Sequence, residues 1–312
     1  MSFSDKVKNE VVREDNLNEC CHLAELAALI KIEGSLEIMN RGLALKLVSQ
    51  RAVVARELYK LLKEKYNYMT EIKVGKRSSF NKENYYVIEL PPQEGIKELL
   101  IECGLIDESY HVSYEIKEEF LEKNCCRKGY LRGLFLASGM LAHPKSEYHM
   151  EFFVKFAEYA TELKELFSSV DIEVKERDRN DKYSLYIKKA DDIIKVLNLI
   201  GAKSAQLKFE NMRIMKEVKN NVNRMVNLET ANLSRTAIAA KEQLEDIELI
   251  SQIKGLNKLS DSLQEIAYLR QDNPYASLKE LGEILGLSKS GVNHRFRRIR
   301  NIADKLINNI AN

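Results

Sequence analysis

The stretch LAALIKIEGSLEI, Leu26 to Ile38, decides how the first part of this chain folds. A helix-like apolar run ends in one acid, Glu33, and one glycine, Gly34, and a strand-like segment follows at once. The acid is either a catalytic group or part of a scaffold with another task. We expect a packing helix whose glycine allows close backbone approach. Glu33 would then be solvated or hydrogen-bonded at the helix end.

The composition indicates a globular protein of two or three domains. The chain has 312 residues, of which 45% are apolar, enough for real cores. Its 49 Lys and Arg against 47 Asp and Glu give a net charge of only +2. This balance argues against a protein held on DNA by its overall charge, but it leaves room for a local basic patch.

The cysteines and the apolar runs indicate a reduced, cytoplasmic protein. The N-terminal MSFSDKVKNEVVRED lacks the apolar core of a secretory signal, and GLFLASGMLA is shorter than the roughly 20 residues that span a bilayer. Four of five cysteines form two adjacent pairs, Cys20-Cys21 and Cys125-Cys126. Structural zinc sites normally use C-x2-C spacing, and adjacent residues of a helix point in different directions. We therefore expect free thiols, mostly small buried side chains, with no metal and no cofactor.

An internal repeat relates two segments at a constant offset of 105 residues. CCHLAELAALIKIEGSL begins at Cys20 and CCRKGYLRGLFLASGML at Cys125. The cysteine pairs, three leucines (Leu26/Leu131, Leu29/Leu134, Leu36/Leu141) and Gly34/Gly139 coincide. Each segment is followed by patterns typical of strand, strand, helix, strand, strand and helix. Two such halves predict an α+β domain with pseudo-twofold symmetry over about residues 18–215. We place the halves at 1–115 and 116–215, followed by a helical domain at 216–312.

Two nine-residue segments carry a family resemblance. Leu26 to Gly34 resembles the LAGLIDADG motif of homing endonucleases, and Leu131 to Gly139 resembles it more weakly. In that family two such helices pack at the centre of a pseudo-dimer, and each contributes one acid, at motif position eight, to divalent metal sites. Position eight is Glu33 in one copy and Ser138 in the other. A hydroxyl cannot replace a carboxylate as a charged ligand, so we expect no catalytic residues and no nuclease activity.

The chain as a whole resembles the WhiA family, bacterial regulators of sporulation and cell division, from about residue 5 to 310. The segment NNVNRMVNLETANLSRTAIAAKEQLEDI, Asn220 to Ile247, resembles the opening of that family's C-terminal domain. The resemblance implies a degenerate LAGLIDADG-like domain followed by an all-α helix-turn-helix domain. It also implies a role in cell division, chromosome segregation or sporulation.

The C-terminal residues themselves predict a helix-turn-helix at about 277–302. Ser277 and Ser288 are good N-caps for the two helices, and Gly286 stands where a tight turn is needed. The expected core consists of Leu281, Ile284, Leu285, Leu287, Val292, Phe296 and Ile299. No acid lies between Ser288 and Ala303, a stretch with five Lys and Arg. The alternatives are a solvated basic helix and a helix pair that binds protein.

The second helix supplies the predicted DNA contacts. Side chains for the major groove are Lys289, Ser290, Asn293, His294 and Arg297. The phosphate contacts on its flanks are Arg295, Arg298 and Arg300. Ser277 and Ser288 belong to the same predicted surface. The segment Gln206 to Leu228 is a helical linker or a further backbone contact, with Arg224 as its candidate.

The predicted sheets carry less decisive charge. Basic candidates for a DNA saddle are Lys73, Lys76, Arg77 and Lys82. In the second half the acids Glu173, Glu176, Asp178 and Asp181 lie beside Lys175, Arg177 and Arg179. This mixture favours contacts with regulatory or division proteins over a continuous DNA saddle.

Together these patterns predict a non-enzymatic, sequence-specific DNA-binding protein that regulates transcription and partners with double-stranded DNA. We expect it in the cytoplasm, associated with the nucleoid and away from membranes. The rival hypotheses are a division-apparatus interaction protein with accessory DNA binding, and a residual metal-dependent nuclease.

Overall fold

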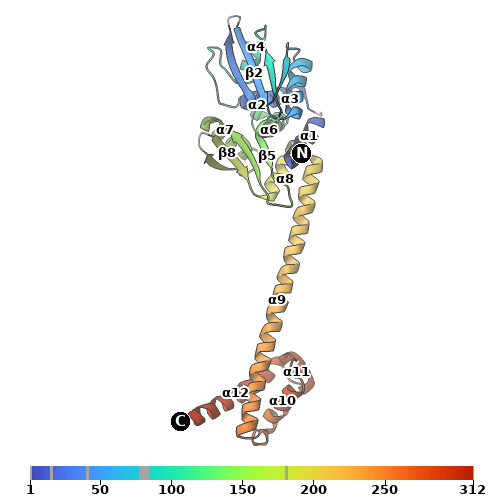
Figure 1. Cartoon of the computed structure of the whole chain (residues 1–312), viewed down its shortest axis with the longest axis vertical. Helices are drawn as coiled ribbons and strands as arrows, with labels where there is room; N and C mark the ends of the chain where they lie inside the picture. The colour runs from blue at the N-terminus through green and yellow to red at the C-terminus, as the bar shows by residue number, and fades with distance from the viewer. Residues whose placement is uncertain (1, 15–16, 40–41, 77–83, 180–181, 312) are drawn as a thin grey trace. The chain divides into compact units, whose positions relative to one another are not determined.

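A computed structural model describes residues 2–14, 17–39, 42–76, 84–179 and 182–311 of the chain (Figure 1). The chain forms two compact units, Met1–Lys216 and Glu217–Asn312. Helix α9, Lys203–Ile253, contributes residues to both. The helices and strands are built as the sequence predicts, in an α+β unit followed by an all-helical one.

The first half of the N-terminal unit packs helices against one four-stranded sheet. Its strands are antiparallel and lie in the order β1-β2-β4-β3. The elements are α2 Glu19–Glu33, β1 Gly34–Met39, β2 Gly42–Ser49, α3 Ala52–Tyr59 continued by a π-turn Lys60–Lys65, β3 Glu71–Lys76, β4 Asn84–Leu90 and α4 Ile96–Glu102.

The second half repeats this topology. Its sheet has the order β5-β6-β8-β7, which matches the first sheet strand for strand. The elements are α5 Glu118–Glu122, α6 Asn124–Ser138, β5 Gly139–Leu141, β6 Met150–Val154, α7 Ala157–Ser168, β7 Lys175–Arg179, β8 Lys182–Ile187 and α8 Ala190–Leu199. The duplication predicted from the 105-residue offset is therefore confirmed at the level of strand order.

Helices α2 and α6 lie side by side at the centre of this unit (Figure 1). The two helices touch through their backbones at two glycines of α6. A Cβ on Gly129 would lie 2.5 Å from the carbonyl oxygen of Cys21, and one on Gly133 would lie 2.3 Å from that of Glu25. The residues Leu26 to Ile30 are at most 2% exposed. The motif helix is thus a packing helix as predicted, but Gly34 meets only its own helix, at Ile30.

A buried ion pair crosses this helix interface. Arg132 of α6 donates from Nε to Oε1 of Glu25 at 3.0 Å, and its Nη2 lies 3.7 Å from Oε1 of Glu57. All three side chains are at most 3% exposed. Charges so deep in the protein require partners, because water cannot solvate them there.

A further helix, α1 Phe3–Arg13, covers the far end of the central pair. Ser2 and Asp5 form a capping box at its start, and Val7 and Val11 are buried in the core of the unit. Its Lys8 is fully buried and donates from Nζ to the carbonyl oxygen of Leu136 at 2.8 Å. No helix was predicted here from the sequence.

The C-terminal unit is a small helical domain with its own core. After the last turns of α9 come a 3-10 turn Leu256–Lys258, α10 Asp261–Asp272, α11 Leu278–Leu285 and α12 Lys289–Ala311. Its core residues include Ile247, Ile250, Leu263, Ile266, Leu281, Val292, Phe296 and Ile299. Leu285 and Leu287 pack against this core.

The prediction that Ile284 belongs to this core is wrong. Ile284 is 58% exposed. A helix turns about 100° per residue, which places Ile284 to one side of Leu281, while Leu278 and Leu285 lie on the other. Only the latter side faces the neighbouring helices.

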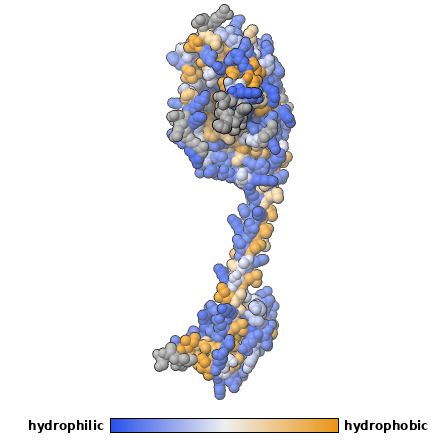
Figure 2. All heavy atoms as spheres, viewed as in Figure 1, coloured by the Kyte–Doolittle hydropathy of each residue, from blue (hydrophilic) through white to orange (hydrophobic). Residues whose placement is uncertain are grey.

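Helix α9 exposes both apolar and polar residues along its middle. Met215, Val218, Val222 and Met225 are each more than half exposed, and hydrophobic residues are visible along this helix in Figure 2. Within the described part of the chain, no helix has the length and apolar character needed to cross a membrane.

Candidate nucleic-acid interface

The turn between α11 and α12 is fixed by caps and glycines. Ser277 accepts a hydrogen bond from the backbone N–H of Glu280 at 3.3 Å, and the Glu280 carboxylate accepts from the N–H of Ser277 at 2.7 Å. Gly286 ends α11 with φ +66°, a conformation that a side chain disfavours. Ser288 then accepts from the N–H of Gly291 at 3.2 Å and so starts α12. Both predicted N-caps are confirmed, so these two hydroxyls serve the backbone.

Helix α12 has one buried and one exposed stripe. Val292, Phe296, Ile299 and Ala303 are at most 4% exposed and face the core. The opposite stripe consists of the exposed residues Ser290, His294, Arg297 and Asn301. These residues repeat at intervals of three or four, as one face of a helix requires. All four side chains can donate hydrogen bonds outward.

The structure divides the predicted arginines into two groups. Arg295 faces α10, where it donates to Glu265 at 2.8 Å and to the carbonyl oxygen of Ser262 at 3.1 Å. Arg300 pairs with Glu242 of α9 at 2.8 Å. Arg297 and Arg298 are exposed, and neither makes an ion pair within 4 Å to any described residue. Arg297 and Arg298 therefore remain available for a ligand, whereas Arg295 and Arg300 hold the domain together.

The remaining predicted residues of α12 lie near its start. Lys289 is exposed and Asn293 is half-buried. The hydroxyl of Ser290 lies 2.9 Å from that of Ser288. Asn301 was not predicted, although the three-to-four spacing from Arg297 would have identified it.

A basic groove, which sequence reasoning missed, adjoins this helix start. It has a volume of about 210 Å³ and contains cationic side chains from three helices: Arg235 of α9, Lys279 of α11 and Lys289 of α12. The N-cap Ser277 and the buried Arg270 also line it. Arg270 donates to the carbonyl oxygens of Asn273 and Ala276 and lies over the ring of Phe296. Arg235 is separated from α11 by more than 40 residues, so only the folded chain shows this grouping.

The predicted backbone contact Arg224 is exposed on α9. It lies in a fully exposed stretch of that helix and has no ion pair to another described residue.

The sheets of the N-terminal unit neutralise much of their own charge. Lys73 pairs with Glu89 and with Glu71, the latter at 3.6 Å, and Lys46 pairs with Glu37 at 3.5 Å. On the second sheet Lys164 pairs with Glu176 at 2.7 Å. Lys76 is exposed, whereas Arg77, Lys82 and Asp181 lie outside the described residues. The described strands thus pair only part of their charge: Lys76, Lys175 and Lys182 are exposed and make no ion pair within 4 Å to another described residue.

The eighth motif position holds a carboxylate on α2 and a hydroxyl on α6. Glu33 ends α2 and accepts from the hydroxyl of Ser49 at 3.3 Å. Burial raises the pKa of Glu33 to about 7, which the positive charge of Lys8 opposes. Ser138 ends α6, and its hydroxyl donates to the carbonyl oxygen of Leu134 within its own helix. Burial also lowers the pKa of Lys8 to about 7.

Comparison with known families agrees with this geometry. Residues 19–106 match the WhiA N-terminal LAGLIDADG-like domain, residues 127–219 the WhiA LAGLIDADG-like domain, and residues 222–303 the WhiA C-terminal HTH domain. The chain belongs to the WhiA family. The resemblance proposed from the motif residues is therefore confirmed.

WhiA relatives match over nearly the full length. Proteins named "Probable cell division protein WhiA" from Halothermothrix orenii and Clostridium botulinum are 47% and 43% identical to this chain, covering 98% of it and 99% of their own lengths. The crystal structure of full-length WhiA from Thermatoga maritima is 27% identical, has a TM-score of 0.60, and covers 98% of this chain and 99% of that one.

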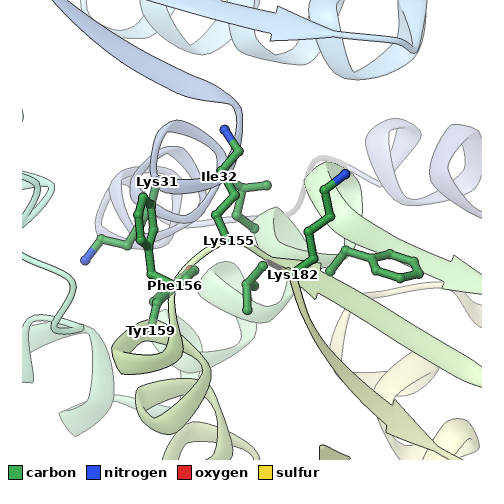
Figure 3. A pocket seen from close by; sticks show the side chains of 8 residues that line it. Lys31, Ile32, Lys155, Phe156, Tyr159 and Lys182 are labelled. Carbon is green, nitrogen blue, oxygen red and sulfur yellow. The ribbon is translucent and has the colours of Figure 1, made fainter. Parts of the chain in front are cut away.

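A small cavity lies beside the motif residues of α2 in this WhiA-family chain. It has a volume of about 150 Å³ and is lined by Lys31, Lys155, Tyr159 and Lys182, among others (Figure 3). Lys31 lies over the Tyr159 ring at 5.4 Å, and burial lowers the pKa of Lys31 to about 8. In Figure 3 the ammonium groups of Lys31 and Lys182 point away from each other. They do not converge on one anion.

Proposed function

We propose that this WhiA-family protein binds double-stranded DNA sequence-specifically through α12. It would act as a non-enzymatic transcriptional regulator in cell division, chromosome segregation or sporulation. The observation that carries the proposal is the exposed stripe of donors, Ser290, His294, Arg297 and Asn301, opposite a buried stripe on the second helix of a capped helix-turn-helix. A major groove admits one α-helix, and its base edges offer acceptors to such side chains.

We propose that cationic side chains on either side of this stripe contact DNA phosphates. Arg298 lies beside Arg297 on the exposed side of α12. The basic groove provides Arg235, Lys279 and Lys289 near the helix start, next to the backbone N–H groups of α11. Helix N-termini and cations favour phosphate oxygens, and such contacts fix the register of the protein on DNA.

The proposed lack of catalysis rests on the ends of α2 and α6. Metal-dependent phosphodiester cleavage by two carboxylates needs an acid at both ends, and Ser138 stands at one. At the other end the buried ammonium of Lys8 contributes positive charge near Glu33, where a divalent cation would have to bind. Incubation with supercoiled plasmid and Mg²⁺ tests this proposal. Nicking that Glu33→Gln abolishes would contradict it.

The DNA proposal is tested by two neighbouring substitutions. A preferred site is first selected from random duplexes, and affinities are then measured for this site and for random DNA over a range of salt concentrations. Arg297→Ala should cost about 1–3 kcal/mol on the preferred site and relax its sequence preference. Arg298→Ala should weaken binding evenly on all sequences and reduce the salt slope by about one.

Lys254→Ala is the matched control, because it removes one exposed cation of the same unit outside α12 and the basic groove. It should leave both affinities unchanged. Equal losses on preferred and random DNA for Arg297→Ala and Arg298→Ala would contradict the role given to Arg297.

A second candidate function is protein contact through the N-terminal unit. The paired charges on its sheets favour it, as do the exposed apolar side chains of Ile38 and Val74 on the strands. The two candidate functions predict different phenotypes for cells that carry a variant without DNA binding. If Arg297→Ala/Arg298→Ala abolishes DNA binding in vitro but leaves division and sporulation unchanged, the protein-contact function is the principal one.

A further inference from the structure

Four cysteine thiols meet where α2 and α6 begin. Cys20 and Cys21 lie in the first turn of α2, and Cys125 and Cys126 in the first turn of α6. All four sulfur atoms lie within 4.8 Å of one another. Cys20 Sγ is 3.9 Å from Cys21 Sγ, and Cys125 Sγ is 4.0 Å from Cys126 Sγ. We had expected adjacent cysteines to point apart, but their side chains turn to the same side at these helix starts.

The spacing fits a single tetrahedral metal ion. Zinc–thiolate bonds of about 2.3 Å place the sulfur atoms of a four-cysteine site about 3.8 Å apart. The sulfur separations within each adjacent pair, 3.9 Å and 4.0 Å, are within a few tenths of an ångström of that value, and all other separations are at most 4.8 Å. We propose that Cys20, Cys21, Cys125 and Cys126 together bind one Zn²⁺ ion. Binding would replace the four S–H protons by the metal and release them to solvent.

The surroundings suit a negatively charged tetrathiolate. The N-termini of two helices converge on the cluster, and the N-terminus of a helix carries partial positive charge. Lys128, one turn into α6, lines the same cavity as Cys21 and Cys125 and adds a full positive charge.

The cluster is accessible to an ion from solvent. A cavity of about 300 Å³ opens beside it, and Cys21 and Cys125 form part of its wall. Cys20 is exposed, Cys125 is half-buried, and Cys21 and Cys126 are buried. The ligand set is therefore partly enclosed but open on one side for loading.

The geometry also separates a site for a single ion from a cluster of several iron atoms. In a cluster of several iron atoms the thiolates bind different irons and must stand farther apart than ligands of one ion. A disulfide would use two of the four sulfurs and leave too few thiolates for a closed site. Metal binding and disulfide formation are thus mutually exclusive outcomes for this cluster.

A metal here would cross-link the two halves of the duplicated domain. Each half contributes one cysteine pair, and the pairs are separated by 105 residues in the sequence. The ion would hold the starting ends of α2 and α6 together, beside the close backbone contact at Gly129. Its role is to stabilise the pseudo-dimer interface, independently of the DNA-binding face of α12.

The test uses the full chain purified under reducing conditions. Elemental analysis by mass spectrometry should find about one zinc per chain. After removal of metal by a chelator, titration with Co²⁺ should give the visible bands and thiolate charge-transfer absorption of a tetrahedral cobalt–thiolate site. Cys20→Ser and Cys125→Ser should each weaken Zn²⁺ binding by about 100-fold or more. Both replace side chains that are not fully buried, so folding should survive.

Cys103→Ala is the matched control. Cys103 is buried in the same unit but stands outside the four-thiol cluster, so its loss should leave the metal content and cobalt spectrum unchanged. The proposal is overturned if the reduced, chelator-treated protein gives no tetrahedral cobalt spectrum. It is also overturned if Cys103→Ala loses metal as fully as Cys20→Ser, or if the isolated protein is metal-free and its intact mass shows a disulfide within the cluster.

Discussion

The two ends of the central helix pair differ in symmetry. At the starts of α2 and α6, both helices contribute the same residues, a pair of cysteines each. At their other ends, α2 contributes Glu33 and α6 contributes Ser138. The buried Lys8 comes from α1, which lies before the first repeated segment.

This contrast shows which end of the helix pair carries the same residue types in both halves of the duplicated fold. A symmetric site needs the same residue from both halves, so the four thiols can act as one ligand set. The opposite end has one carboxylate and a cation from outside the repeat. A shared two-carboxylate metal site therefore cannot form there from this chain alone.

The largest expected effect comes from breaking the buried ion pair that joins α2 and α6. Arg132→Leu would leave the carboxylates of Glu25 and Glu57 buried without their arginine. We expect a loss of about 3–5 kcal/mol in unfolding free energy. Urea denaturation, followed by hydrogen exchange of the α2 and α6 amides, measures it. Lys189→Leu breaks an exposed pair with Glu173 and should change nothing measurable; equal losses in both variants would contradict the role of burial.

A smaller effect should come from pushing the helices apart near the cysteine end. Gly129→Ala would bring a methyl group within 2.5 Å of the backbone of Cys21. Such overpacking costs about 1–3 kcal/mol, and here it should also spread the thiols and weaken Zn²⁺ binding. Gly291→Ala in α12 is the control, because its Cβ would meet nothing closer than 3.6 Å. It should preserve or raise stability; a tolerated Gly129→Ala would mean that the contact is looser than described.

The smallest effect concerns Lys8 and depends on pH. Burial lowers its folded-state pKa from 10.5 to about 7, so the unfolded chain binds more protons between these values. Stability therefore rises with pH across this window and is lost as pH falls toward 7. Between pH 7 and 9 the wild type should gain about 1–2 kcal/mol relative to Lys8→Met, as measured by urea unfolding at both pH values.

Glu33→Gln provides the comparison for that experiment. The folded-state pKa of Glu33 is raised from 4.5 to about 7, so the folded protein binds more protons than the unfolded chain between these pH values. Glu33 therefore lowers the stability as pH rises from 4.5 to 7 and has no further effect above pH 7. Glu33→Gln should therefore keep the wild-type rise in unfolding free energy between pH 7 and 9. If Lys8→Met shows the same rise, Lys8 does not titrate in the folded protein with the lowered pKa given above.

Much of the fold could be predicted from short-range patterns. The 105-residue offset indicated the duplicated halves, and alternating or helical periodicity indicated the elements within them. Ser277, Gly286 and Ser288 marked the helix-turn-helix, because caps and positive-φ turns depend on neighbouring residues only.

Apart from Asn301 and Ile284, which local helix spacing decides, the misses depend on contacts distant in sequence. The convergence of Cys20 and Cys125 requires the helix starts to lie together. The pairing of Arg295 with Glu265 spans 30 residues and removes that side chain from the predicted DNA face. Lys8 acts on Glu33 only because α1 covers the end of the helix pair. Pattern and spacing specify elements, whereas their packing decides which side chains meet.

The exposed stripe of α12 has a definite length. It runs from Ser290 to Asn301 and gives way to the acidic Asp304, which repels phosphate. At about 1.5 Å per residue the stripe covers about 17 Å, the length of roughly five base pairs. A five-base-pair word recurs about once per thousand base pairs, while a genome offers about 10⁶ or more competing sites. If α12 reads DNA as proposed, one copy cannot address a single promoter by itself. Its target must then repeat the word at a fixed spacing, or be read in part by other contacts.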